Sequence, residues 1–190
     1  MGGKKVRAED VIRIYQNLSA HNVQAWLTGG WGIDALLQTQ TRPHKDLDVI
    51  ILVEDIVRMR ELLSHDGYDL NHLWPENSWI VDANGVEVPT AFVLQDSEGR
   101  EVDAHAIRLD DQGGGIPAWL NDGLVFRMED LAGKGMIAGV AVRCLSPEMQ
   151  MVCHEGYDLP DEQFRDLELL EEKFDIQSPH GNPFSRRSLP

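Results

Sequence analysis

The stretch TGGWGID at residues 28–34, followed by RPHKDLDV at residues 42–49, decides how this chain folds and which chemistry it supports. Two consecutive glycines, Gly29 and Gly30, come after a short predicted strand and before a predicted helix. The backbone N–H groups at the start of such a helix are free to bind a phosphate, and its dipole favours negative charge there. The glycines therefore predict a turn that can cradle phosphates.

Two carboxylates follow at the start of the strongest predicted strand, residues 47–53, which is rich in Val, Ile and Leu. Because side chains alternate along a strand, Asp46 and Asp48 lie on one face. Their mutual repulsion favours a cation between them, and carboxylate oxygens suit magnesium. A phosphate cradle beside paired carboxylates indicates nucleotidyl transfer. The alternative is a solvated strand entrance, and the glycines alone are a weak signal.

A third carboxylate lies on a predicted antiparallel hairpin formed by residues 86–94 and 100–107. Asp103 shares a face of the second strand with Glu101 and His105, and it joins the first two aspartates if this strand neighbours theirs. Its alternative role is a salt bridge with Arg42 or Arg100. Pro89 implies a sheet edge or a bulge in the first strand.

The apolar spacing predicts one α/β (α+β) unit with a mixed sheet, helices and a small C-terminal helical lobe. The boundaries we expect are residues 1–112 for the core, 113–176 for a mostly helical lobe after the glycines at 113–115, and 177–190 for a frayed tail. Predicted helices cover residues 8–21, 31–37 and 54–63, with a strand at 24–27; two later helices begin at Ser146 with Pro147 and at Pro160.

Composition narrows the function classes. The chain has 190 residues, 42% of them apolar, which suffices for one good core. Its net charge of −15 disfavours a nucleic-acid partner and suits a cationic small molecule. No apolar stretch approaches the roughly 20 residues that span a bilayer, so we expect a cytoplasmic protein without a membrane anchor. Cys144 and Cys153 are expected to be reduced, packed thiols.

Taken together, the diglycine, Asp46-x-Asp48 and the isolated Asp103 resemble the DNA polymerase β-like nucleotidyltransferase superfamily. More narrowly, residues 29–48 look like its small antibiotic-resistance members, the lincosamide nucleotidyltransferases and the aminoglycoside 2''-nucleotidyltransferases. Residues 144–167 look like the lincosamide group, so the resemblance covers most of residues 8–175. It implies the polymerase β-like fold, a twisted mixed sheet flanked by helices.

The hypothesis for the site assigns a role to each candidate residue. Gly29 and Gly30 bind the phosphates of ATP or another nucleoside triphosphate, and Arg42 counters the charge on the pyrophosphate. Asp46 and Asp48 hold two Mg²⁺ ions, one of them shared with Asp103. The general base is Asp103 or, as the alternative, Glu87 on the adjacent strand.

An acceptor pocket is the least defined part of the hypothesis. Candidates for it are His105, His154 and Tyr157, although the run around His154 also reads as a helix end followed by a glycine stop. His44 and His105 are expected at most to support the carboxylates. The side chains of Trp31, Trp74 and Trp79 suit the core as well as a stacking role.

The expected activity is transfer of a nucleoside monophosphate, AMP from ATP, to a hydroxyl of a small antibiotic, with a lincosamide favoured by the resemblance. The alternatives are an aminoglycoside acceptor, a toxin-like enzyme that modifies a protein or RNA, and a catalytically silent nucleotide-binding module. The sequence leaves open the nucleotide, the modified hydroxyl, and whether the protein is a monomer or a homodimer.

Overall fold

The computed structural model describes residues 4–121, 123–154 and 160–177. Five α-helices, one 3₁₀ turn and ten strands are found in these residues. In chain order they are α1 (Ala8–Ala20), β1 (Ala25–Thr28), α2 (Gly29–Leu37), β2 (Asp46–Leu52), η1 (Val53–Asp55), α3 (Ile56–His65), β3 (Asp69–Leu73), β4 (Trp79–Val81), β5 (Glu87–Pro89), β6 (Ala91–Gln95), β7 (Glu101–Leu109), β8 (Gly115–Pro117), β9 (Lys134–Ile137), β10 (Val140–Arg143), α4 (Pro147–Cys153) and α5 (Asp161–Phe174).

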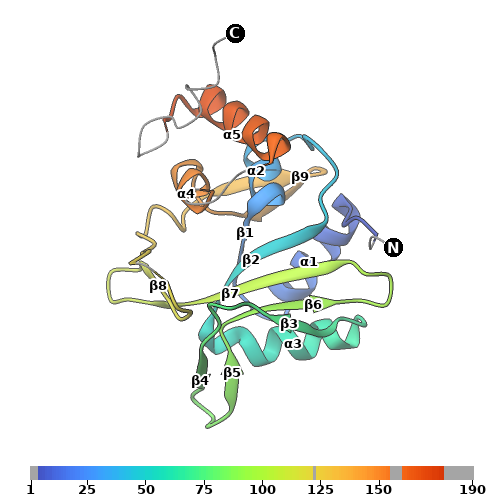
Figure 1. The fold of residues 1–190 in the computed structure, drawn as a ribbon, viewed down its shortest axis with the longest axis vertical. Helices are drawn as coiled ribbons and strands as arrows, with labels where there is room; N and C mark the ends of the chain where they lie inside the picture. Colours follow the sequence, from blue (N-terminus) through green and yellow to red (C-terminus); the bar gives the residue numbers. More distant parts are fainter. Residues whose placement is uncertain (1–3, 122, 155–159, 178–190) are drawn as a thin grey trace.

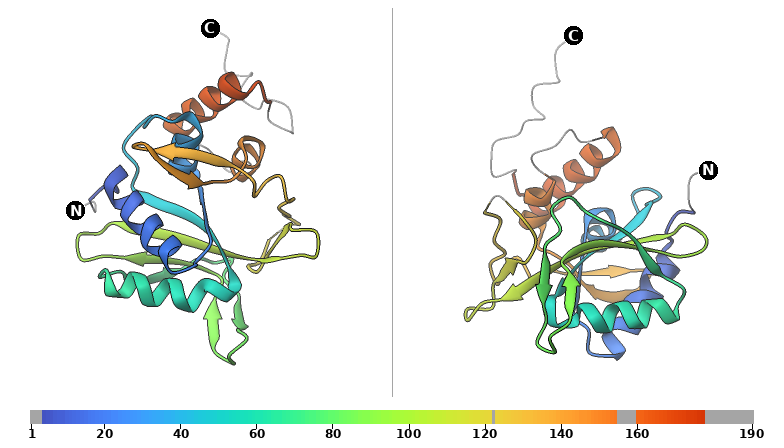
Figure 2. Two further views of the ribbon diagram at one scale, coloured as in Figure 1. Left: turned by 180° about the vertical axis from the view of Figure 1, so that it is seen from behind. Right: turned by 60° about the horizontal axis from the view of Figure 1, so that its bottom comes forward.

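The main sheet has the strand order β1-β2-β7-β6-β3, and β8 pairs with β7 (Figure 1). β2 and β7 are parallel, whereas the other pairs are antiparallel, so the sheet is mixed as the sequence predicts. Figure 2 shows α1 and α3 together over one face. Leu47, Val49 and Ile51 of β2 are buried in the core cluster on that side. The opposite face of β2 therefore carries Asp46 and Asp48.

The predicted helices and strands of the first 65 residues are confirmed, with one informative shift. Helix α2 begins at Gly29, two residues before its expected start, so the glycines form its first turn instead of preceding it. At the other end of the chain, Ser146 caps α4 by accepting a hydrogen bond from the backbone N–H of Met149 at 3.2 Å. Helix α5 begins one residue after Pro160, as expected.

The predicted strand at residues 86–94 is wrong as one continuous element. It divides at Thr90 into β5, which pairs with β4 in a separate two-stranded sheet, and β6, which pairs with β7. The backbone N–H of Thr90 donates to Asn77 Oδ1 at 2.8 Å and to the carbonyl oxygen of Ser78 at 3.1 Å, whereas the carbonyl of Thr90 accepts from Ala106 of β7 at 2.8 Å, so the chain changes partners at this residue. Pro89 has no N–H to donate, so the chain leaves the main sheet beside it.

The chain after residue 112 contains more strand than expected. β8 hydrogen-bonds to β7, and β9 and β10 form their own two-stranded sheet, in which β9 packs against helix α2. The division at residue 112 stays a prediction, and the tail from residue 178 lies outside the described residues. Among the helices that the structure describes, none is long and apolar enough to cross a membrane.

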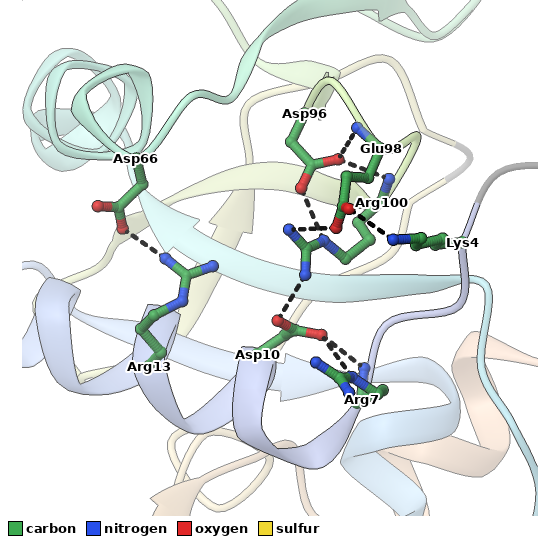
Figure 3. A network of polar contacts seen from close by, with 8 residues as sticks. All are labelled: Lys4, Arg7, Asp10, Arg13, Asp66, Asp96, Glu98 and Arg100. Atoms are coloured by element: carbon green, nitrogen blue, oxygen red, sulfur yellow. Dashed lines mark hydrogen bonds and ion pairs between the residues drawn. The ribbon is translucent and has the colours of Figure 1, made fainter.

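An ion-pair network ties α1 to the turn between β6 and β7 (Figure 3). Arg100 lies at its centre, with NH1 2.9 Å from Asp10 Oδ1 and Nε 2.7 Å from Asp96 Oδ2. Arg100 is therefore engaged on the far side of the sheet from Asp48, and it is not the salt-bridge partner of Asp103, which was one of the two alternatives for that residue.

Candidate active site

The parallel pairing of β2 with β7 brings the predicted aspartates together. In this register the Cα of Asp48 lies opposite that of Asp103, and Asp46 lies opposite Glu101. Strands that pair in parallel with no offset place equivalent side chains on the same face. Four acidic residues from two segments that are far apart in the sequence, the three predicted aspartates among them, thus share one surface of the sheet.

These aspartates open into a cavity of about 540 Å³. Predicted residues that line it are Gly29, Gly30, Arg42, Asp46, Asp48, Asp103, His105 and His154. Tyr157 lies outside the described residues. Eight of the predicted site residues therefore border one cavity, while their roles stay predictions.

Glu87 is not brought to this cavity. Because β5 leaves the main sheet, Glu87 lines a separate cavity of about 410 Å³ together with residues of α3 and β3. This placement is a correction to its role as the alternative base. Asp103 is the candidate base that lines the same cavity as Asp46 and Asp48.

The two glycines make room for side chains from the neighbouring loop and strand. A Cβ at Gly29 would lie 2.2 Å from Asp48 Oδ2, and a Cβ at Gly30 would lie 2.2 Å from His44 Nδ1. Gly29 also has φ +59°, a conformation that L side chains rarely adopt. The carboxylate of Asp48 consequently packs directly against the start of α2.

The negative charge of the Asp46–Asp48 pair is only partly compensated by Lys45 and Arg42. Burial raises the pKa of Asp48 well above its usual value, and the charges of Asp46 and Asp103 raise it further. Burial also raises the pKa of Asp46, although Lys45 opposes this effect. Lys45 Nζ lies 2.5 Å from Glu101 Oε2 but 4.0 Å from Asp46 Oδ2, so its main partner is Glu101.

The carboxylate of Asp103 is positioned by the side chains of Trp74 and His105. The indole Nε1 of Trp74 donates to both of its carboxylate oxygens, at 2.9 and 3.0 Å. His105 Nδ1 lies 3.4 Å from Asp103 Oδ1, and its Nε2 lies 3.2 Å from Glu76 Oε1. Burial lowers the pKa of His105, but the hydrogen bond and charge of Asp103, with those of Glu76, leave it above its usual value.

Several lining residues were not assigned to the site from the sequence. Lys5 and Lys45 add positive charge, and Trp119, Leu124 and Phe126 form an apolar wall. The ring of Trp119 packs edge-on against the rings of His105 and Phe126, with centroid-to-centroid distances of 4.9 and 6.3 Å. Only Lys45 carried a sequence signal, since it directly precedes Asp46; the others arrive from loops and from the N-terminal segment.

The carboxylate oxygens of Asp46 and Asp48 are suitable ligands for a hard divalent cation. Two neighbouring carboxylates with raised pKa values are stabilised by an added positive charge, and their oxygens are the ligands that magnesium prefers. Over residues 4–121, 123–154 and 160–177, no three acidic, His or Cys side chains already converge as a metal site. The shared role of Asp103 as a third ligand therefore stays a prediction, while Asp46 and Asp48 fit the ion.

The sheet, the helix start beside it and the carboxylates define the protein as a nucleotidyltransferase of the polymerase β-like fold. The family model of the aminoglycoside-2''-adenylyltransferases matches residues 10–170, and the chain belongs to that family.

Individual relatives agree with this placement. A lincosamide resistance protein of Staphylococcus haemolyticus is 26% identical over 170 residues, which cover 90% of this chain and 98% of the relative. The crystal structure of lincosamide antibiotic adenylyltransferase LnuA, lincomycin-bound, superposes with a TM-score of 0.73 at 27% identity, over 88% of this chain and 98% of that one. The structure of ANT(2'')-Ia with adenylyl-2''-tobramycin shares the fold, with a TM-score of 0.63 at 19% identity, over 87% and 88% of the two chains.

Proposed function

We propose that this protein transfers AMP from ATP to a hydroxyl of a lincosamide and releases pyrophosphate. The observation that carries the proposal is the register of β2 and β7, which places Asp48 beside Asp103 in a cavity that begins at the diglycine. A reaction that consumes ATP also agrees with the predicted cytoplasmic location.

Cationic and backbone groups of the cavity suit the triphosphate. The free N–H groups at the start of α2 and the side chains of Arg42 and Lys45 line the cavity, where they would bind the three negatively charged phosphates of ATP. Two Mg²⁺ ions held by Asp46 and Asp48, with Asp103 as a further ligand, would neutralise the phosphates and make the acceptor hydroxyl more acidic. Arg42 stabilises negative charge as it develops on the pyrophosphate.

Asp103 is the proposed general base. Its carboxylate takes the proton from the acceptor hydroxyl, whose oxygen forms a bond to the α-phosphorus. The bond between that phosphorus and the bridging oxygen of pyrophosphate breaks, and its electron pair leaves with the pyrophosphate. The hydrogen bonds from Trp74 hold the base in one orientation before the proton moves.

The aromatic and apolar lining of the part of the cavity where we place the acceptor favours a lincosamide over an aminoglycoside. Trp74 and Trp119 present aromatic surface there, beside Leu124, and the buried ring of Phe126 packs behind Trp119. Such a wall suits an acceptor with an apolar arm and little charge, whereas a polycation needs several carboxylates that remain free to bind it. The family model, which is described by an aminoglycoside activity, keeps the aminoglycoside as the second candidate acceptor.

The test is incubation of the pure protein with MgATP and a panel of lincosamides and aminoglycosides, followed by mass spectrometry. We expect the mass of one added AMP on a lincosamide, no addition after chelation of the metal, and no addition by Asp103→Asn. If AMP is added to an aminoglycoside instead, the acceptor is an aminoglycoside and the proposed lincosamide acceptor is wrong. A panel without any product, together with nucleotide addition to a protein or RNA, would refute the proposed substrate class.

A further inference from the structure

The loop between α2 and β2 delivers Arg42 to the cavity, and a residue far along the chain holds it there. Arg42 Nε donates to Asp166 Oδ2 at 2.8 Å, across 124 positions of sequence. Asp166 lies on α5 and is only 2% exposed. A second carboxylate of α5, Glu162, lies 4.0 Å from NH1 of Arg42, but its side chain is 75% exposed.

Asp166 also holds the residue before Arg42. Its other oxygen, Oδ1, lies 2.7 Å from the hydroxyl of Thr41. The same hydroxyl lies 2.8 Å from Asp34 Oδ1, and the backbone N–H of Thr41 donates to that oxygen at 3.0 Å. Asp34 in turn accepts a hydrogen bond from His44 Nε2 at 2.5 Å. Two buried aspartates from different helices thus fix three positions of one loop.

Helix α5 is fixed to α2 by contacts that do not involve Asp166. Leu167 and Leu170 are buried in the main core, and Lys173 Nζ donates to the carbonyl oxygens of Leu36 and Leu37 at 3.0 and 2.9 Å. These are among the carbonyls that the end of α2 leaves without helical partners. Figure 1 shows α5 lying beside α2, and Figure 2 shows the same neighbourhood from behind. Neutralising Asp166 therefore leaves other anchors of α5 in place.

We propose that Asp166 is a positioning residue for the nucleotide: it aims the Arg42 guanidinium at the triphosphate, so that nucleotide affinity depends on a carboxylate of α5. This inference rests on the proposed function of the cavity. Arginine loses much rotamer freedom when it binds a phosphate, and a side chain already held in place loses less. A planar guanidinium engaged at Nε still presents other N–H groups to an anion.

A second effect has the opposite sign, because a carboxylate beside arginine also weakens the attraction of the arginine for phosphate. Orientation prevails here since Asp166 is buried and binds both Thr41 and Arg42, whereas a guanidinium released from it has exposed Glu162 as a neighbour. When Asp166 is neutralised, the loss of orientation raises the Kd of MgATP, whereas the loss of the neighbouring negative charge lowers it. A measured Kd therefore distinguishes the two effects.

The experiment measures the Kd of MgATP by calorimetry without acceptor for the wild type, Asp166→Asn, Arg42→Gln, the double variant and Glu162→Gln. We expect Asp166→Asn and Arg42→Gln each to raise Kd at least tenfold, and the double variant to equal Arg42→Gln. Glu162→Gln removes the same charge one helical turn away and should change Kd less than twofold. In turnover assays Asp166→Asn should raise KM for ATP while KM for the acceptor stays constant.

Unchanged or tighter binding by Asp166→Asn, or additive losses in the double variant, would overturn the inference while leaving the proposed transferase intact. Thermal unfolding shows whether Asp166→Asn is folded. Should it not fold, Arg42→Lys keeps the charge but loses the Nε bond to Asp166, and an unchanged Kd there would equally refute the inference. A wild type that binds no MgATP would instead overturn the proposed function, and this inference with it.

Discussion

Replacement of Gly29 by alanine tests the central geometry of the site. Alanine at φ +59° enters a left-handed conformation that costs a residue with a Cβ about 1–2 kcal/mol. In addition, its Cβ would lie 2.2 Å from Asp48 Oδ2, whereas ordinary contacts begin near 3.4 Å, so the carboxylate must move by about 1 Å. A misplacement of about 1 Å at a reacting centre costs on the order of 100-fold in rate.

Gly67→Ala is the matched control, because Gly67 has φ +85° and a Cβ added to it would meet no atom within 4 Å. It carries the same kind of backbone cost without the clash. For a chain of this size a loss of about 1–2 kcal/mol lowers Tm by roughly 2–8 °C. We expect both variants to show at least this loss, while only Gly29→Ala loses about 100-fold in kcat/KM for AMP transfer.

The assay is pyrophosphate release at a temperature well below both unfolding transitions, with Tm measured on the same samples. If Gly29→Ala keeps kcat/KM within about threefold of the wild type, the contact between Asp48 and the helix start is irrelevant to catalysis. If Gly67→Ala loses activity to the same degree, the loss reflects stability and the argument from the clash is wrong.

Three further predictions concern single side chains. Asp48→Asn should abolish pyrophosphate release yet raise Tm at pH 7 in EDTA, because a carboxyl group whose pKa is raised in the folded state destabilises the fold once it is ionised. The gain in Tm should vanish as the pH falls toward 3.8, the ordinary pKa of the carboxyl group. A lower Tm of the variant at pH 7 would contradict the proposed repulsion. Trp74→Phe removes the hydrogen-bond donor to both carboxylate oxygens of Asp103. Because hydrogen bonds to charged groups contribute about 1.5–3 kcal/mol, kcat should fall roughly 10- to 150-fold while KM for ATP stays unchanged. An unchanged kcat would show that Asp103 does not depend on these hydrogen bonds. Burial raises the pKa of the Cys144 and Cys153 thiols to about 12, so a thiol reagent at pH 8 should modify neither in the native protein and both in guanidinium chloride, and fast native labelling would disprove their packing.

The sequence by itself determined the local parts of the site. Strand alternation fixes Asp46 and Asp48 on one face wherever β2 packs, and the glycines determine that a helix can start within contact of a carboxylate. Both features depend on a few successive backbone dihedral angles, which neighbouring residues set. The same reasoning gave the helices of the first 65 residues to within a few positions.

Only the tertiary structure decided which distant groups meet. The register that puts Asp103 beside Asp48, the indole of Trp74 on Asp103 and the carboxylate of Asp166 on Arg42 all join segments separated by tens of residues. Glu87 shows the converse, since one break beside Pro89 moved it to another cavity. Such pairings follow from how whole faces are buried against each other, a sum over the entire core that no short stretch of sequence contains.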